Sequence, residues 1–275
     1  MFDFKYMKKT LLLILYNLPL LIYSQKTVNV IAINGLKLRS TPNEKGLVLE
    51  KIPFGTNLTV LSNTKIACKP ILIFKIDTVN ADQSGNTIKQ DLSLKGTFLK
   101  INFDGKIGYI NDLFVSRVIP NFIFLKQKQN DKDIKPEAGT YFYLLNQHFK
   151  VKEVDKNELG YTETINEEKT TTITYTKQYP NGLHYTYRSD YTDNGIGGDG
   201  FILTAKNLSC NEAIMMAHLL FYPSNDSKDY KIGFEYDKEN NIYALDYYGE
   251  GGGTSAKIYK NEKGYWVLEY SSGAC

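Results

Sequence analysis

A hairpin turn in the first half of the chain constrains the fold more than any other feature. Asp104-Gly105 separates two runs of strand-forming residues, 98–103 and 107–110, and Asp-Gly is among the dipeptides best suited to a two-residue hairpin. Four earlier runs of the same kind, bounded by turn residues, cover residues 28–33, 36–39, 48–52 and 58–61. Several short strands joined by tight turns predict a small β-barrel over residues 28–118.

Four motifs in this region, in the same order, resemble bacterial SH3 (SH3b) domains. Residues 35–42 (GLKLRSTP) are similar to the GLNLRSGP opening of the family, and residues 98–110 (FLKINFDGKIGYI) are similar to its conserved hairpin. Residues 53–61 (PFGTNLTVL) resemble an intervening strand of the family, and residues 111–114 (NDLF) resemble its ending. The resemblance implies an SH3-like small β-barrel for residues 25–119.

The chain departs from the family pattern in two ways. Phe98 and Tyr109 stand at positions where the family has Trp, so the rings are kept and the indole donors are lost. Between Leu61 and Phe98 there is also an insertion of roughly 30 residues. Because compact domains rarely hold a structureless loop of that length, we expect an inserted β-hairpin that carries Cys68.

The resemblance implies binding and not catalysis. Members of the family attach exported proteins to peptidoglycan peptides or mediate protein contacts, so the implied partner is a cell-wall peptide or an envelope protein. The aromatic and basic residues of the module are the candidate ligand contacts, namely Arg39, Phe54, Phe98 and Tyr109. The alternative is that the rings fill the barrel core and that Arg39 packs at a turn.

Residues 1–24 have the features of a secretory signal peptide. Lys8 and Lys9 precede an apolar stretch, residues 11–23, which is followed by the small residue Ser24. This stretch is too short to span a bilayer core of about 30 Å, although an uncleaved anchor helix is the alternative. We therefore predict an exported protein, periplasmic or secreted, whose mature chain begins near Gln25 and has no membrane span.

Export changes the interpretation of the three cysteines, because disulfides persist in oxidising compartments. A Cys210–Cys275 disulfide would hold the C-terminus in place and close a loop of about 65 residues, which chain-entropy models value at about 4 kcal/mol. Cys68 would then be buried and inert, or it would be the true partner of one of the other two. The sequence does not choose among the three pairings.

The second half of the chain differs in composition from the first. Residues 120–138 are polar and are predicted to form a linker, whereas residues 139–275 hold 17 of the 21 tyrosines, many of them alternating with polar residues as in strands. Ser209 and Glu212 form a capping-box pattern that predicts one helix ending before Pro223. We expect an α+β domain of an antiparallel sheet and one helix, which makes the whole chain mainly β.

Few motifs for chemistry are present in the second half. Residues 195–200 (GIGGDG) fit the GxGxxG spacing but lack the preceding strand of a nucleotide site, so we expect a flexible loop there. The chain has no HExxH, CxxC or GxSxG pattern. We therefore predict no catalytic residue, metal or cofactor. Tyr247, Tyr248 and Glu250 border a glycine-rich loop and are candidate ligand contacts, with an exposed turn as the alternative.

The net charge of +3 conceals an uneven distribution. Residues 25–119 have 13 Lys+Arg and 7 Asp+Glu, a net charge of +6, whereas residues 120–275 have 17 and 22, a net charge of −5. Such a modest total argues against a nucleic-acid partner, and the basic half suits an anionic cell wall. We predict a non-enzymatic exported binding protein. The alternatives are a periplasmic inhibitor or immunity-type protein and a cell-wall hydrolase of another family.

Overall fold

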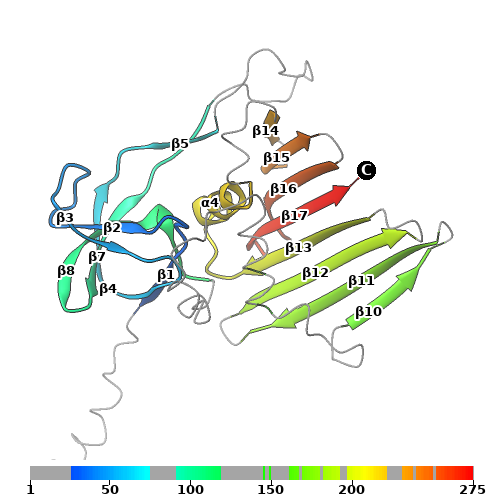
Figure 1. Ribbon diagram of the computed structural model, residues 1–275, viewed down its shortest axis with the longest axis horizontal. Coiled ribbons are helices and arrows are strands. Elements are labelled where there is room, and N and C mark those ends of the chain that lie inside the picture. Colours follow the sequence, from blue (N-terminus) through cyan, green and yellow to red (C-terminus); the bar gives the residue numbers. More distant parts are fainter. Residues whose placement is uncertain are drawn as a thin grey trace, which may run out of the picture.

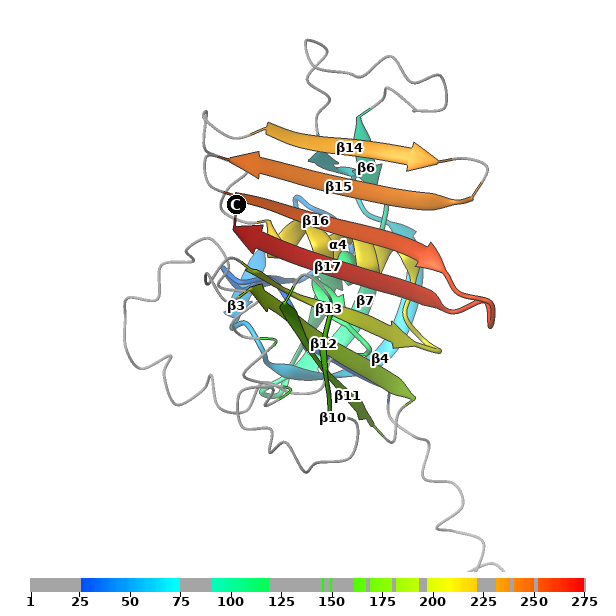
Figure 2. The same cartoon turned by 90° about the vertical axis from the view of Figure 1, so that its right-hand side faces the viewer.

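Two large antiparallel sheets, with a helix over Cys210–Leu220 between them, make up most of the described part of the protein (Figures 1 and 2). The computed structural model describes residues 26–74, 91–118, 145, 149, 161–166, 169–179, 182–192, 197–221, 231–237, 240–249 and 252–274. This part of the chain is mainly β, as the sequence predicts. The predicted signal peptide and linker lie outside the described residues.

The first sheet has seven strands in the order β3-β2-β8-β7-β4-β1-β9. Its strands are β1 (Thr27–Val30), β2 (Leu36–Arg39), β3 (Val48–Ile52), β4 (Asn57–Ala67), β7 (Thr97–Phe103), β8 (Lys106–Asn111) and β9 (Val115–Ser116). The predicted hairpin is confirmed, because Asp104 and Gly105 join β7 to β8 with φ values of 48° and 80°. The 3-10 helix η2 (Asp112–Phe114) connects β8 to β9.

The predicted inserted hairpin is present as strands β5 (Ile71–Phe74) and β6 (Leu92–Leu94), which pair antiparallel in a sheet of their own. Its turn, residues 82–86, lies outside the described residues. Cys68 lies between β4 and β5, and its backbone N–H donates to the Gly96 carbonyl at 2.9 Å. The hairpin does not stand apart, because Ile73 and Leu94 are buried in the same core as the helix.

The second sheet has eight strands in the order β10-β11-β12-β13-β17-β16-β15-β14. The strands are β10 (Tyr161–Ile165), β11 (Thr170–Gln178), β12 (Leu183–Thr192), β13 (Gly197–Ala205), β14 (Lys231–Asp237), β15 (Ile242–Gly249), β16 (Gly252–Lys260) and β17 (Trp266–Ala274). Two successive hairpin arrays meet where β13 pairs with β17, and α4 (Cys210–Leu220) lies in the connection between the arrays.

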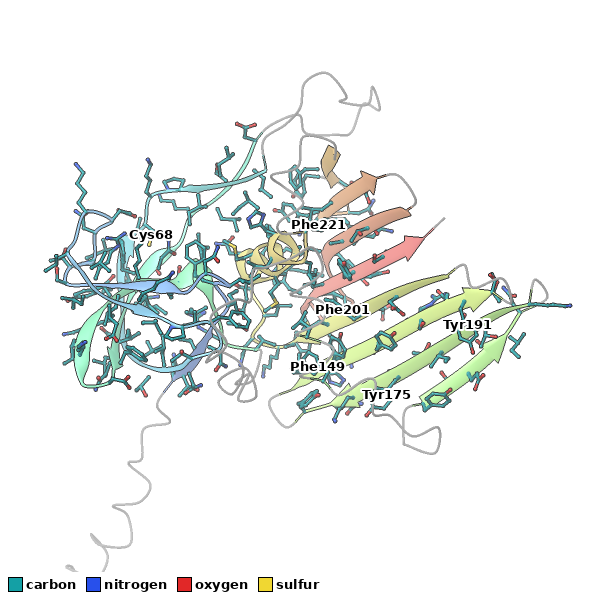
Figure 3. All side chains as sticks on the ribbon, in the orientation of Figure 1. Cys68, Phe149, Tyr175, Tyr191, Phe201 and Phe221 are labelled. Atoms are coloured by element: carbon teal, nitrogen blue, oxygen red, sulfur yellow. The ribbon has the colours of Figure 1, made fainter. Side chains whose placement is uncertain are left out.

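The alternation of tyrosine with polar residues places one set of rings against α4. Tyr185 is fully buried whereas His184 beside it is exposed, as expected for successive residues of a strand. Phe149 stacks on Tyr185 with ring centroids 3.9 Å apart, and the series continues through Phe201 and Tyr270 at 5.2 and 5.4 Å (Figure 3). This row of rings forms the aromatic core of the second half.

The GxGxxG-like segment, which we expected to form a loop, contributes to a strand. Gly197, Gly198 and Gly200 lie inside β13, so the part of this segment within the described residues is a strand. A Cβ atom on Gly200 would lie 2.5 Å from the Tyr270 carbonyl oxygen, and one on Gly198 would lie 2.6 Å from that of Ser272. These glycines are required because β13 and β17 approach too closely for side chains at these positions.

The helix α4 is buried on nearly all sides because it lies between the two sheets (Figure 1). One core cluster includes Ile31, Phe54 and Leu113 of the first half together with Met216 of α4 and Phe201 of the second sheet. A smaller cluster, which includes Leu38 and Ile101, lies wholly within the first sheet. The two predicted domains therefore share part of their core.

Candidate functional site

A groove beside strand β2 is a candidate ligand site with mostly apolar walls. We call it the β2–β5 groove. It has a volume of about 340 Å³, and its apolar lining residues are Ala32, Leu36, Pro70, Ile71, Phe98 and Phe114. Lys69, Pro70 and Ile71, at the start of the inserted hairpin, line the groove together with residues of β2. Its size is within the range of small-ligand pockets.

Charged side chains also line this groove. Lys37, Arg39 and Lys69 supply three cations, which we call the cationic rim, and Glu44 supplies one carboxylate. The Arg39 guanidinium donates to the Gly46 carbonyl at 2.9 Å and so braces the loop between β2 and β3. The backbone N–H of Lys69 donates to the Glu44 carboxylate, and this hydrogen bond is the main reason why the pKa of Glu44 lies below its ordinary value.

The structure brings together two of the four predicted contacts in the first half. Arg39 and Phe98 both line the β2–β5 groove, although Phe98 is only 2% exposed and forms part of its buried wall. Phe54 is buried in the core shared with α4, whereas the alternative placed its ring in the barrel core. Tyr109 is half-buried on β8, where it pairs with Arg39 in register, and it does not line the groove.

The predicted contacts in the second half lie on strand β15 or directly follow it in the sequence. Tyr247 and Tyr248 lie on β15, where their backbones pair with Thr254 and Gly253, and their side chains lie outside the described part. Glu250 also lies outside it. Their role in binding stays a prediction.

Sequence reasoning missed Lys37, Lys69 and Glu44. Lys37 lies within the SH3b-like motif at the outward position of an alternating strand, so its exposure was foreseeable. Lys69 and Glu44 are 25 residues apart, and the backbone N–H of Lys69 donates to the Glu44 carboxylate. No local pattern signals that contact.

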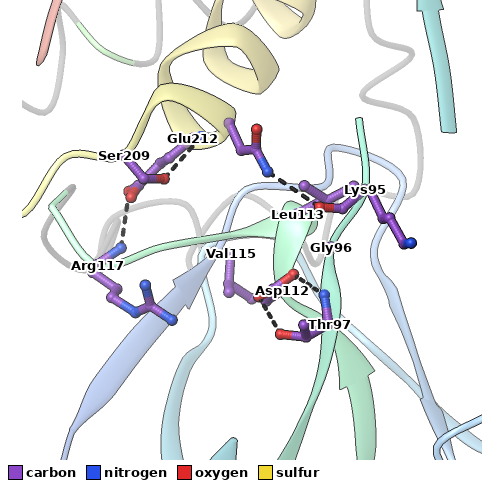
Figure 4. A pocket seen from close by; sticks show the side chains of 10 residues that line it. Lys95, Gly96, Thr97, Asp112, Leu113, Val115, Arg117, Ser209 and Glu212 are labelled. Carbon is purple, nitrogen blue, oxygen red and sulfur yellow. Dashed lines mark hydrogen bonds between the residues drawn. The ribbon is translucent and has the colours of Figure 1, made fainter. Parts of the chain in front are cut away.

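A second, more polar cavity of about 270 Å³ lies where the first sheet meets the N-terminus of α4 (Figure 4). We call it the junction cavity. On one side, the Asp112 carboxylate accepts hydrogen bonds from the backbone N–H and the hydroxyl of Thr97, both at 2.7 Å. On the other side, the Asn211 side chain donates to the Lys95 carbonyl at 3.2 Å. The hydrogen bond between Asn211 and Lys95 connects the two halves of the protein.

Glu212 is the most deeply buried carboxyl group at this junction, with 6% of its surface exposed. The Ser209 hydroxyl accepts from the Glu212 backbone N–H at 3.2 Å, which confirms the predicted helix cap. The Glu212 carboxylate instead accepts from the Ser116 hydroxyl at 2.5 Å and from the Arg117 backbone N–H at 2.9 Å. Burial raises the pKa of Glu212, while these hydrogen bonds oppose that shift.

The cysteines described by the structure carry free thiols. Cys68 is 2% exposed, and burial raises its pKa to about 12; burial also raises the pKa of Cys210, to about 11. Such thiols are protonated at neutral pH and are poor nucleophiles. The predicted Cys210–Cys275 disulfide is not seen, and Cys275 lies outside the described residues, so the pairing stays a prediction.

Within the described ranges, no group of three or more His, Cys, Asp or Glu residues is arranged to hold a metal ion. In the same part of the chain, no helix is both long enough and apolar enough to cross a membrane. Neither a protein-family model, nor a curated protein, nor a solved structure matches this chain.

Proposed function

We propose that the chain is an exported, non-enzymatic binding protein, periplasmic or secreted, whose SH3b-like first module binds cell-wall peptides in the β2–β5 groove. The observation that carries the proposal is the combination of apolar walls and a cationic rim in that groove. Arg39 and Phe98, two residues implied by the SH3b resemblance, line it. The antiparallel order of short strands in residues 27–116 is compatible with this family.

The groove composition favours binding over catalysis. Among the described residues that line it, Glu44 is the single carboxylate, and none is Ser, Thr, Cys or His. Hydrolysis of a peptide or glycan requires a nucleophile or an acid and base placed beside the scissile bond. The second sheet would then contribute the framework around α4 and a surface for a second partner.

The test is co-sedimentation of residues 25–275 with insoluble peptidoglycan. We expect the protein to pellet with the wall, and we expect Ala32→Trp, which places an indole in the groove, to stay in the supernatant. Thermal unfolding of the Ala32→Trp variant controls for misfolding. A wild-type protein that stays in the supernatant would contradict wall binding.

The same preparation distinguishes the two alternatives. Release of soluble wall fragments by the wild-type protein would favour the hydrolase. A stable enzyme that co-purifies with the protein in place of the wall would favour the inhibitor.

A further inference from the structure

We propose that the β2–β5 groove selects peptides with a free carboxylate, which pairs with the ammonium groups of Lys37 and Lys69 while the apolar walls hold the neighbouring side chains. This inference rests on the proposed function and narrows the ligand to anionic peptides. The evidence for this selectivity is the charge of the residues that line the groove.

Strand β2 places like charges next to each other at the groove. Lys37 pairs directly with Lys51 of β3, and both side chains are exposed. Like charges directly opposite each other in a sheet are destabilising. Lys51 also lies against the groove, because its Cε atom is 3.1 Å from the position that a Cβ of Gly35, a lining residue, would take.

The carboxylates nearby are already engaged. Glu50 of β3 forms a salt bridge with Lys106 at 2.8 Å, and Glu44 accepts the backbone N–H of Lys69. Within the described part of the chain, the ammonium groups of Lys37 and Lys51 have no ion-pair or hydrogen-bond partner. The cationic rim outnumbers Glu44 by three charges to one, so an anionic ligand would relieve repulsion that the protein itself leaves in place.

Glu44 and Arg39 act as positioning residues for this rim. The Glu44 carboxylate ties the start of the inserted segment at Lys69 to the loop that follows β2, and Arg39 ties the same loop at Gly46. These hydrogen bonds fix the backbone at Lys69 and the guanidinium of Arg39 before a ligand arrives. A preorganised rim loses less entropy on binding than one on a free loop.

The apolar walls of the groove determine which class of anionic ligand it can bind. Pro70, Ile71 and Phe114 offer apolar surface next to the cations, which suits a peptide whose carboxylate adjoins aliphatic side chains. A free phosphate would leave these walls uncovered. A nucleic acid would require a wider basic face than these few lysines supply. The observations therefore favour a peptide carboxylate.

The experiment compares the peptide acetyl-Ala-Leu-Ala as the free acid with the same peptide as its C-terminal amide, titrated into residues 25–275. We expect the acid to bind about tenfold more tightly than the amide, because a hydrogen bond to a charged group is worth about 1.5 kcal/mol or more. Lys37→Glu and Lys69→Glu should each abolish this preference. Lys65→Glu, which makes the same charge change away from the groove lining, should retain it.

The outcomes separate this inference from the proposed function. Equal affinity for acid and amide, or equal loss of the preference with Lys65→Glu, would overturn carboxylate selection. A protein that pellets with the wall but binds neither peptide would also overturn it, while leaving wall binding intact. A protein that neither pellets nor binds the peptides would refute both.

Discussion

Replacing Glu212 tests whether the two halves of the protein are joined as the structure indicates. In Glu212→Ala, the Ser116 hydroxyl and the Arg117 backbone N–H lose their acceptor, and Ser116 is completely buried. Removing the acceptor of a buried hydrogen bond costs about 1–3 kcal/mol. Ser116 also accepts from the Val118 backbone N–H at 3.0 Å, which limits how far its hydroxyl can turn away. We expect a total loss of about 2–3 kcal/mol in the free energy of unfolding.

The assay is urea unfolding followed by the fluorescence of Trp266, the one tryptophan in the chain. Glu262→Ala serves as the matched control, because Glu262 is exposed in the turn between β16 and β17. We expect this control to change the free energy of unfolding by less than about 0.5 kcal/mol. If Glu212→Ala were equally mild, the hydrogen bonds at the junction would not contribute to stability and the reasoning would fail.

The same carboxyl group predicts a dependence on pH. The pKa of Glu212 is raised from its ordinary value of 4.5 in the folded protein. The protonated carboxyl group therefore makes its full contribution to the stability of the folded state below pH 4.5. The contribution is lost as the pH rises through the folded pKa. Glu212→Gln cannot ionise, so the stability of wild type minus that of Glu212→Gln should fall with rising pH. A difference that stays constant or grows from pH 4 to pH 8 would refute the shift.

Three further predictions concern other parts of the chain. Gly200→Ala should destabilise the protein by about 1–3 kcal/mol, because the new methyl group would meet the Tyr270 carbonyl oxygen; a neutral effect in urea unfolding would contradict the close approach of β13 and β17. Cys68 and Cys210 should react slowly with Ellman's reagent at pH 8, since their thiols are protonated there, and fast labelling before unfolding would be contrary to their burial. Mass spectrometry of exported material should show a chain beginning near Gln25, whereas an intact leader would favour an anchor helix.

Much of the fold was predictable because its signals are local. The Asp104-Gly105 turn depends on residues a few positions apart. The Ser209 cap likewise depends on a contact three residues away. The prediction of a loop at residues 195–200 was wrong for the part that lies in β13, because glycine in a strand depends on how closely the neighbouring strand approaches.

The sequence by itself determined a mainly β chain, its hairpins, one capped helix and a basic first half, since periodicity and turn chemistry act over short distances. Only the tertiary structure decided that the Glu212 carboxylate, which the capping pattern directs to its own helix, binds Ser116 almost a hundred residues earlier. It also decided that Lys69 and Glu44 meet at one groove with Lys37. These contacts depend on how α4 and the inserted hairpin pack, and packing between distant segments leaves no periodic trace in the sequence.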